Sequence, residues 1–299
     1  MLFELFDTRK PYERQIACCG PALLALVTDI PDAGVTELLL HNRYLMIYII
    51  YITAGCYPVG KEQTMLEFKN VSYSVAGKDI LKNVNIQIDD RFVAVTGPNG
   101  SGKSTMAKLI AGIIKPTEGR IYMDGVDITD MSITDRANAG ISFAFQQPMR
   151  FKGITVKDLI SLAAGKETSV SDACAYLSEV GLCAKDYVTR EVDGSLSGGE
   201  LKRIEIAMIN ARGTKLSVFD EPEAGIDLWS FNNLIKVFEN MHERTKGMII
   251  IISHQERILN IADKIIVLAN GSVADYGEKD VVFPKLMDVR SGCYVTNKN

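Results

Sequence analysis

The sequence lacks the residue patterns of a zinc protein or a small secreted scaffold, and it has no excess of basic residues. No two of its six cysteines show C-x-x-C spacing, and a chain of 299 residues, 47% hydrophobic, has ample length to bury a core without disulfides. The formal net charge is −4, so no basic face for nucleic acid is indicated. We therefore expect a globular protein of the reducing cytoplasm that binds no nucleic acid.

A membrane-spanning segment is also missing from Met65–Asn299, so we expect no direct membrane insertion. Upstream, Tyr44–Ala54 is almost wholly apolar, but it is shorter than the about 20 residues of a spanning helix and too deep for a cleavable signal peptide. Lys61-Glu62 can be encoded by a ribosome-binding sequence just ahead of Met65. The expectation is that the native protein begins at Met65 and that residues 1–64 are a non-native or disordered upstream extension; the alternative is a genuine N-terminal segment.

What the sequence does have is a phosphate-binding loop. The apolar stretch Phe92–Thr96 predicts a short buried strand, and the residues that follow fit the pattern G-x-x-x-x-G-K-[ST] before a helix. Backbone N–H groups of such a loop converge on phosphate oxygens, the lysine adds a point charge, and the serine hydroxyl suits Mg²⁺. The predicted ATP-binding residues of the loop are Gly97, Pro98, Asn99, Gly100, Ser101, Gly102, Lys103, Ser104 and Thr105.

Two further strands are predicted to end in functional side chains. Leu216–Phe219 is followed by Asp220, which suits a Mg²⁺ shell, and by Glu221, which suits the general base for the attacking water. Met248–Ser253 is followed by His254, which would reach the γ-phosphate from the end of a parallel strand. Strands of this kind separated by helices predict an α/β P-loop core.

The segment "LSGGE" precedes a helix with apolar residues at helical spacing, so Ser197, Gly198 and Gly199 lie at a second helix N-terminus suited to anions. With this segment in place, the chain resembles the ATP-binding cassette (ABC) ATPases from Met65 to about Gly277. The resemblance implies a parallel sheet, an N-terminal antiparallel β part and an inserted helical subdomain. It also implies ATP hydrolysis with Mg²⁺ in a head-to-tail homodimer.

The resemblance assigns roles to individual residues. Gln146 matches the glutamine that contacts Mg²⁺ and senses the γ-phosphate, Glu221 the catalytic base and His254 the switch histidine. Ser197, Gly198 and Gly199 match the residues that bind the nucleotide of the other subunit, and Asp227 matches an aspartate that contacts that subunit. One departure is Val75, which stands where the family usually stacks an aromatic on adenine; Tyr73 would share its strand face and substitute only in part. Weak base stacking is therefore expected.

Local segments narrow the resemblance. "AFQQP", "REVDGSLSGGE" and "SHQERIL" resemble the Suf-type iron–sulfur cluster assembly ATPases, and "FDEPEAGIDLWS" resembles their short two-component form. The first reading is therefore an ATPase that remodels a Suf B/D-type scaffold protein and itself holds no cluster. The alternatives are the ATPase subunit of an ABC transporter and a regulatory module that does not hydrolyse ATP, which the presence of Glu221 opposes.

The expected organisation is an ABC ATPase domain over residues 65–280, with a helical subdomain at about 148–195, and a loose C-terminal tail over 281–299. The segment Gln146–Gly153 would join the ATP site to the partner, with Met149, Arg150 and Phe151 as candidate partner contacts; the alternative is a loop that packs on its own subdomain. Lys202 and Arg203 are expected on a solvated face.

Overall fold

The computed structural model describes residues 64–148 and 150–295. Residues 1–63 of the predicted upstream extension and Met149 therefore lie outside the described residues. Among the helices of the described part, none combines the length and apolar character needed to cross a bilayer.

The N-terminal part is a four-stranded antiparallel sheet in the order β2-β1-β4-β5. Its strands are β1 Leu66–Val75, β2 Lys78–Ile88, β4 Glu118–Met123 and β5 Val126–Asp127. Buried residues alternate with exposed ones along much of β2, which is the pattern of a sheet with one face on the core. The expected antiparallel β part is confirmed.

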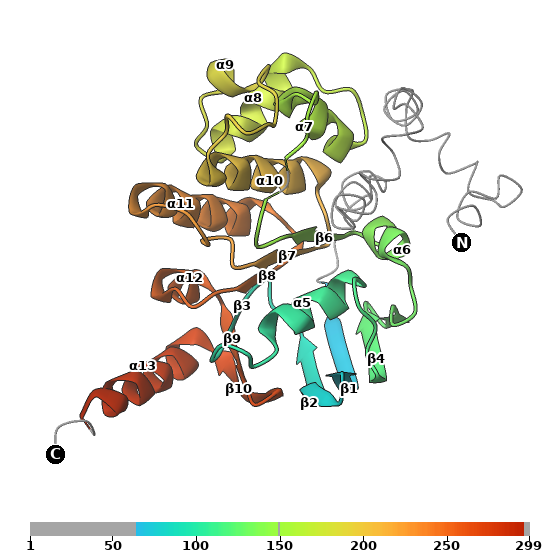
Figure 1. Cartoon of the computed structure of the whole chain (residues 1–299), viewed down its shortest axis with the longest axis vertical. Coiled ribbons are helices and arrows are strands. Elements are labelled where there is room, and N and C mark those ends of the chain that lie inside the picture. Colours follow the sequence, from blue (N-terminus) through green and yellow to red (C-terminus); the bar gives the residue numbers. More distant parts are fainter. Residues whose placement is uncertain (1–63, 149, 296–299) are drawn as a thin grey trace, which may run out of the picture.

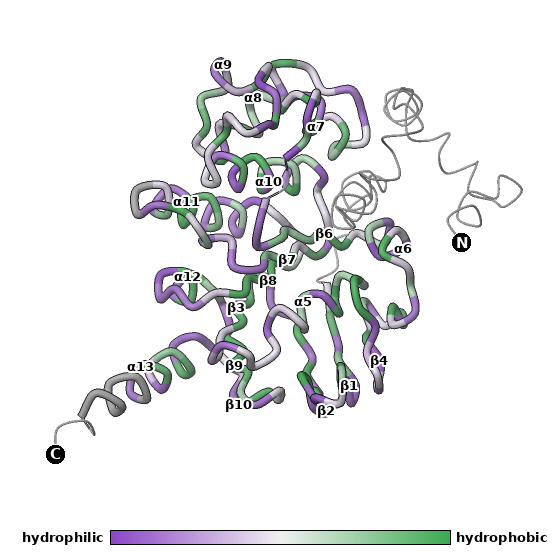
Figure 2. Tube along the Cα trace, viewed as in Figure 1, coloured by the Kyte–Doolittle hydropathy of each residue, from purple (hydrophilic) through white to green (hydrophobic). Residues whose placement is uncertain are grey.

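The second sheet has six strands in the order β10-β9-β3-β8-β7-β6, and all but β10 run parallel. Its strands are β3 Phe92–Thr96, β6 Ile141–Ala144, β7 Leu216–Asp220, β8 Met248–Ile252, β9 Lys264–Ala269 and β10 Ser272–Glu278. Every residue of β3, β6, β7 and β8 is buried, as expected for strands covered on both faces. Figure 2 shows that hydrophobic residues lie along these central strands. The predicted α/β P-loop core is confirmed.

Helices cover this sheet and connect its strands (Figure 1). They are α5 Lys103–Ala111, α6 Ile133–Asn138, α10 Gly198–Arg212, α11 Leu228–Arg244 and α12 Glu256–Ile261. Helix α5 follows β3 directly, and α10 precedes β7. Two of the segments predicted to bind phosphate therefore begin helices.

Three helices lie between β6 and α10, at the top of Figure 1: α7 Val156–Ala164, α8 Val170–Glu179 and α9 Ala184–Tyr187. Thr155 and Ser169 cap α7 and α8 by accepting backbone N–H bonds. Helices α7 and α8 both pack against α10, so α10 joins this helical part to the sheet.

The expectation of a loose C-terminal tail is wrong for the described residues. Residues 279–295 form helix α13, Lys279–Val295, which extends away from the body of the molecule (Figure 1). Its first turns contact β9, β10 and α12, and Val282 is buried in the core. The helix continues through Pro284, and the burial of Val282 anchors its first turn to the rest of the protein.

Candidate functional site

The phosphate-binding loop connects β3 to α5, at the carboxyl end of a central parallel strand. A Cβ at Gly97 would lie 2.0 Å from the Leu268 carbonyl oxygen, and one at Gly102 would lie 2.5 Å from Leu81 Cδ2. Both glycines also have positive φ. The loop conformation therefore requires glycine at these positions, for space as well as for backbone angles.

Lys103 and Ser104 face the loop and the acidic strand end. Lys103 Nζ donates to the carbonyl oxygens of Gly97 at 2.8 Å and Pro98 at 3.0 Å. Ser104 Oγ donates to Asp220 Oδ1 at 3.0 Å. Burial lowers the pKa of Lys103 and raises that of Asp220, since both charges are partly removed from water.

These residues fit a Mg²⁺–ATP site. The adjacent hydroxyl of Ser104 and carboxylate of Asp220 are oxygen ligands of the kind that Mg²⁺ prefers. The buried Ser101 Oγ has no hydrogen-bond partner among the described residues, as befits a loop built to hold phosphate. The other predicted loop residues, Asn99, Gly100 and Thr105, lie in the same turn and the first turn of α5.

Glu221 is held between Gln146 and His254. Gln146 Nε2 donates to Glu221 Oε2 at 2.7 Å, and His254 Nε2 lies 3.6 Å from Glu221 Oε1. The three residues follow β6, β7 and β8, which are neighbours in the sheet. Glu221 has φ of 47°, an unfavourable backbone conformation for a side chain of its size. The structure thus brings together three residues predicted from separate segments.

The "LSGGE" segment begins α10, as predicted. Ser197 Oγ accepts the N–H of Glu200, and the N–H of Ser197 donates back to Glu200 Oε2 at 2.6 Å, which forms a capping box. A Cβ at Gly198 would lie 3.9 Å from the Gly225 carbonyl oxygen, and one at Gly199 would lie 3.8 Å from Ser230. These glycines therefore approach the segment that contains Asp227, whose Oδ1 accepts the Ser230 N–H at 3.0 Å.

Burial of Lys202 contradicts the expectation of a solvated face. The side chain of Lys202 is 1% exposed, and that of its ion-pair partner Glu205 is 2% exposed. Arg203 is partly exposed and donates to the carbonyl oxygens of Gly199 and Gly181. The prediction for Lys202 was wrong because it assumed that a charged residue faces solvent, whereas α10 is buried on nearly all sides. The i, i+3 spacing of Lys202 and Glu205 predicts a contact between the two side chains but not their burial.

Glu223 was also missed by the sequence analysis. The Ser253 hydroxyl donates to Glu223 Oε1, and the same hydroxyl accepts the Gln255 N–H at 3.0 Å. Burial raises the pKa of Glu223. This carboxyl therefore supports the backbone on both sides of His254, which no motif indicated.

The proposed partner contact at Phe151 is wrong. Phe151 is 5% exposed and packs in the core, and its N–H donates to the Val192 carbonyl oxygen at 2.7 Å. Arg150 is exposed. The alternative, a loop that packs on its own helical part, describes Phe151 correctly, because its side chain is buried and its backbone bonds to Val192.

The segment of β1 that was predicted to face adenine differs from the expectation at Tyr73. Tyr73 packs against the core whereas Val75 is 51% exposed, and the pairing of β1 with β2 shifts register between Tyr73 and Ser74. The register shift interrupts strict alternation along the strand. Tyr73 is therefore not a free substitute for a stacking aromatic.

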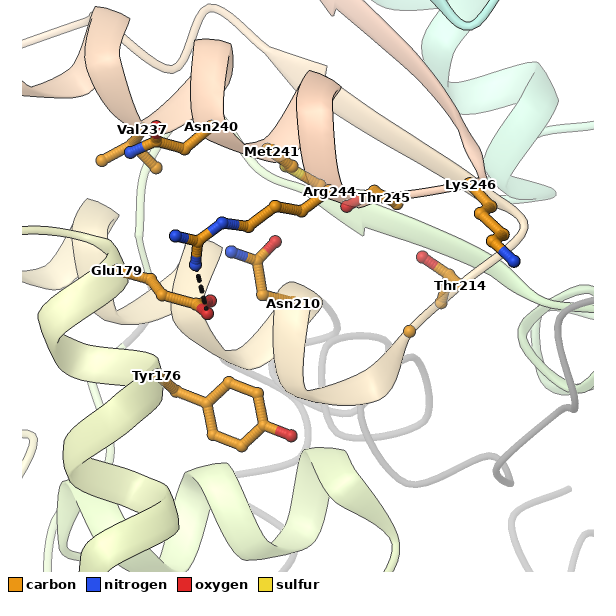
Figure 3. A pocket seen from close by; sticks show the side chains of 11 residues that line it. Tyr176, Glu179, Asn210, Thr214, Val237, Asn240, Met241, Arg244, Thr245 and Lys246 are labelled. Carbon is orange, nitrogen blue, oxygen red and sulfur yellow. Dashed lines mark hydrogen bonds and ion pairs between the residues drawn. The ribbon is translucent and has the colours of Figure 1, made fainter.

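A cavity of about 360 Å³ lies elsewhere, between α8 and the C-terminal ends of α10 and α11 (Figure 3). Arg244 donates to Glu179 at 2.9 Å beside it, so an ion pair joins α11 to α8. None of the predicted site residues lines this cavity. It is separate from the site around Lys103.

Comparison with known proteins agrees with this geometry. Residues 81–224 match the family model described as "ABC transporter". An uncharacterized ABC transporter ATP-binding protein of Methanocaldococcus jannaschii is 38% identical over 223 residues, covering 72% of this chain and 89% of that protein. A probable ATP-dependent transporter of Pyropia yezoensis is 34% identical, with 72% and 92% covered. An energy-coupling factor transporter ATP-binding protein of Caldanaerobacter subterraneus is 35% identical, with 68% and 73% covered.

A solved structure of similar fold is a dimeric post-hydrolysis state of an ATP-binding cassette bound to ADP and Pi. It has a TM-score of 0.63 and 26% identity, and the match covers 72% of this chain and 98% of that one. The phosphate-binding loop, the acidic strand end, the "LSGGE" segment and the relatives all indicate the same family. The chain belongs to the ATP-binding cassette family and is an ATPase that binds ATP with Mg²⁺.

Proposed function

We propose that this chain hydrolyses ATP in a dimer and uses dimer closure to change the conformation of a separate partner protein. The observation that carries the proposal is Glu221, held by Gln146 and His254 beside Lys103, Ser104 and Asp220. A carboxylate fixed in this way is suited to accept a proton from water.

Each residue of the candidate site then has a role. Lys103 and the loop glycines would bind the phosphates, while Ser104, Asp220 and the Gln146 amide oxygen would hold Mg²⁺. When bound, the metal neutralises charge on the phosphate oxygens. Glu221 orients and deprotonates the water, and His254 lies beside it to contact the terminal phosphate.

Dimerisation follows from the position of the "LSGGE" segment. In the single chain, the neighbours of Gly198 and Gly199 are Gly225 and Ser230, in the segment of Asp227, and not the loop around Lys103. A second copy would bring its own Ser197 and glycines to the nucleotide, with Asp227 at the contact. The cassette of similar fold was solved as a dimer, which supports this arrangement.

The partner that the relatives favour is a transporter subunit. The similar proteins of M. jannaschii and C. subterraneus are named as transporter ATP-binding proteins, and that of P. yezoensis as a probable ATP-dependent transporter. The sequence segments alone predicted a Suf-type ATPase first, with a transporter subunit as the alternative, and these names support the transporter subunit better. We therefore place the transporter subunit first.

A Suf B/D-type scaffold stays as the second candidate because specific segments favour it. "AFQQP", "REVDGSLSGGE" and "SHQERIL" surround Gln146, Ser197 and His254, the residues at the site. The motor chemistry is the same in both cases, since either partner needs about 5.5 kcal/mol of differential binding to move from 1:99 to 99:1.

Co-purification decides between the two partners. The tagged chain is isolated from its native cells with ATP and the Glu221→Gln substitution, once with mild detergent and once without. Recovery of an integral membrane protein only in detergent supports the transporter. A scaffold recovered equally in both preparations reverses the order.

A further inference from the structure

A buried ion pair on α10 holds the residue that precedes Gln146. Lys202 Nζ lies 3.3 Å from Glu205 Oε2, and both side chains are almost fully buried. Lys202 Nζ also donates to the Phe145 carbonyl oxygen, and the Phe145 N–H donates to Glu205 Oε1 at 3.2 Å. The two charges thus bind both backbone polar groups of one residue.

A contribution to stability alone does not account for this pair. Taking two charges out of water costs several kcal/mol per ion, and apolar residues of similar volume are often as stable in such places. Unlike apolar side chains of the same volume, Lys202 and Glu205 form hydrogen bonds with the backbone of Phe145. The geometry therefore fixes the backbone position at the end of β6.

The position of the Phe145 backbone affects the next residue, Gln146. Gln146 reaches Glu221 Oε2 over 2.7 Å, so a shift of the Phe145 backbone displaces the amide from the carboxylate. The pair stands on the same helix that Ser197 begins, and α7 and α8 pack on that helix. Movement of α10 would therefore be transmitted to Gln146 through Lys202 and Glu205.

We infer that Lys202 and Glu205 are positioning residues, which couple helix α10 to Gln146 by binding the backbone of Phe145. This inference rests on the proposed function of Gln146 and Glu221. In the described part of the chain, the hydrogen bonds of Lys202 and Glu205 lead to Phe145 and to each other, not to Gln146 or Glu221. The charge of Lys202 also acts at a distance on Asp220, and the Gln146→Ala background separates that effect from the route through Phe145.

The test is the double substitution Lys202→Met with Glu205→Leu, which keeps the volume and removes both charges together. We expect kcat for ATP hydrolysis to fall at least about tenfold, because displacement of a catalytic group by 1 Å can cost about 100-fold. The Kd for ATP should stay within threefold, and the Phe145 amide should exchange with deuterium faster. A folded double variant with kcat within twofold of the parent overturns the inference.

A second background shows whether the pair acts through Gln146. In Gln146→Ala, the same double substitution should change kcat less than twofold, because the route to Glu221 is already lost. An undiminished loss in that background contradicts the inference. The matched control is Lys115→Met with Asp130→Leu, which removes an exposed ion pair and should leave kcat unchanged.

Lys202→Met alone provides the test if the double variant fails to fold. Burial raises the pKa of Glu205, so its carboxyl can take a proton and still accept the Phe145 N–H. We expect a loss of about fivefold in kcat with unchanged ATP affinity, and unchanged kcat overturns the inference. Failure of the proposed function looks different, since Glu221→Gln would then leave turnover intact.

Discussion

Gln146 donates a hydrogen bond to Glu221 across 2.7 Å, although 75 positions separate the two residues in the chain. The contact exists because β6 and β7 are parallel neighbours, so both residues leave the sheet at the same edge. His254 approaches the other carboxylate oxygen from the end of β8. The site is thus assembled from three strand ends.

Removing the charge of Glu221 should stop turnover. Glu221→Gln keeps the shape of the side chain and loses the basic oxygen, so kcat should fall by about 10²–10⁴-fold. ATP binding should persist, and dimers should accumulate with ATP in size-exclusion chromatography with light scattering. The control Glu239→Gln, on the exposed side of α11, should retain full turnover. Normal hydrolysis by Glu221→Gln would exclude Glu221 as the base.

The loop glycine Gly97 should tolerate no side chain. Gly97→Ala would place Cβ 2.0 Å from the Leu268 carbonyl oxygen at a φ of 142°, so the loop must move. We expect ATP affinity to fall more than tenfold by titration calorimetry. Gly77→Ala is the control for backbone strain alone, because its φ is 75° and nothing lies within 4 Å of the added Cβ. That variant should lose about 1–2 kcal/mol of stability and keep its ATP affinity; equal affinities in both variants would contradict the steric argument.

Glu223 should make stability depend on pH. Burial raises its pKa above the ordinary value of 4.5, so its stabilising contribution is complete below that value and is lost as the pH rises through the folded-state pKa. In Glu223→Gln the amide oxygen still accepts the Ser253 hydroxyl, but no proton is lost. The free energy of unfolding from urea titrations should therefore fall less steeply with rising pH than in the parent. Glu243→Gln, at an exposed site, should follow the parent; parallel curves for Glu223→Gln and the parent would show that burial does not control this carboxyl.

An aromatic at position 75 should strengthen ATP binding. Val75 is 51% exposed, and stacking of a base on an aromatic ring is worth about 1–3 kcal/mol. We expect Val75→Tyr to lower the Kd for ATP about tenfold while the affinity for inorganic triphosphate stays the same. Val126→Tyr adds the same ring at another exposed valine, and it should change neither affinity. A Kd unmoved by Val75→Tyr would place the adenine elsewhere.

Several features of this protein were determined by the sequence itself. The G-x-x-x-x-G-K-[ST] pattern predicts the phosphate-binding loop, and the apolar runs before the loop, Glu221 and His254 predict buried strands. Short-range rules of spacing and hydrophobicity are enough for such elements. They led to the correct fold class and to the predicted site residues on the strand ends.

Only the tertiary structure decided which side chains lose contact with water. Lys202 and Glu205 are charged, yet helices and strands distant in the chain surround them. Phe151 is an aromatic residue of a kind common at protein interfaces, yet its own helical part covers it. Val282 similarly anchors α13 to the core, where composition had predicted a tail. Burial depends on neighbours brought together by folding, and no local pattern encodes those neighbours. For that reason the link from α10 to Gln146 is visible only in three dimensions.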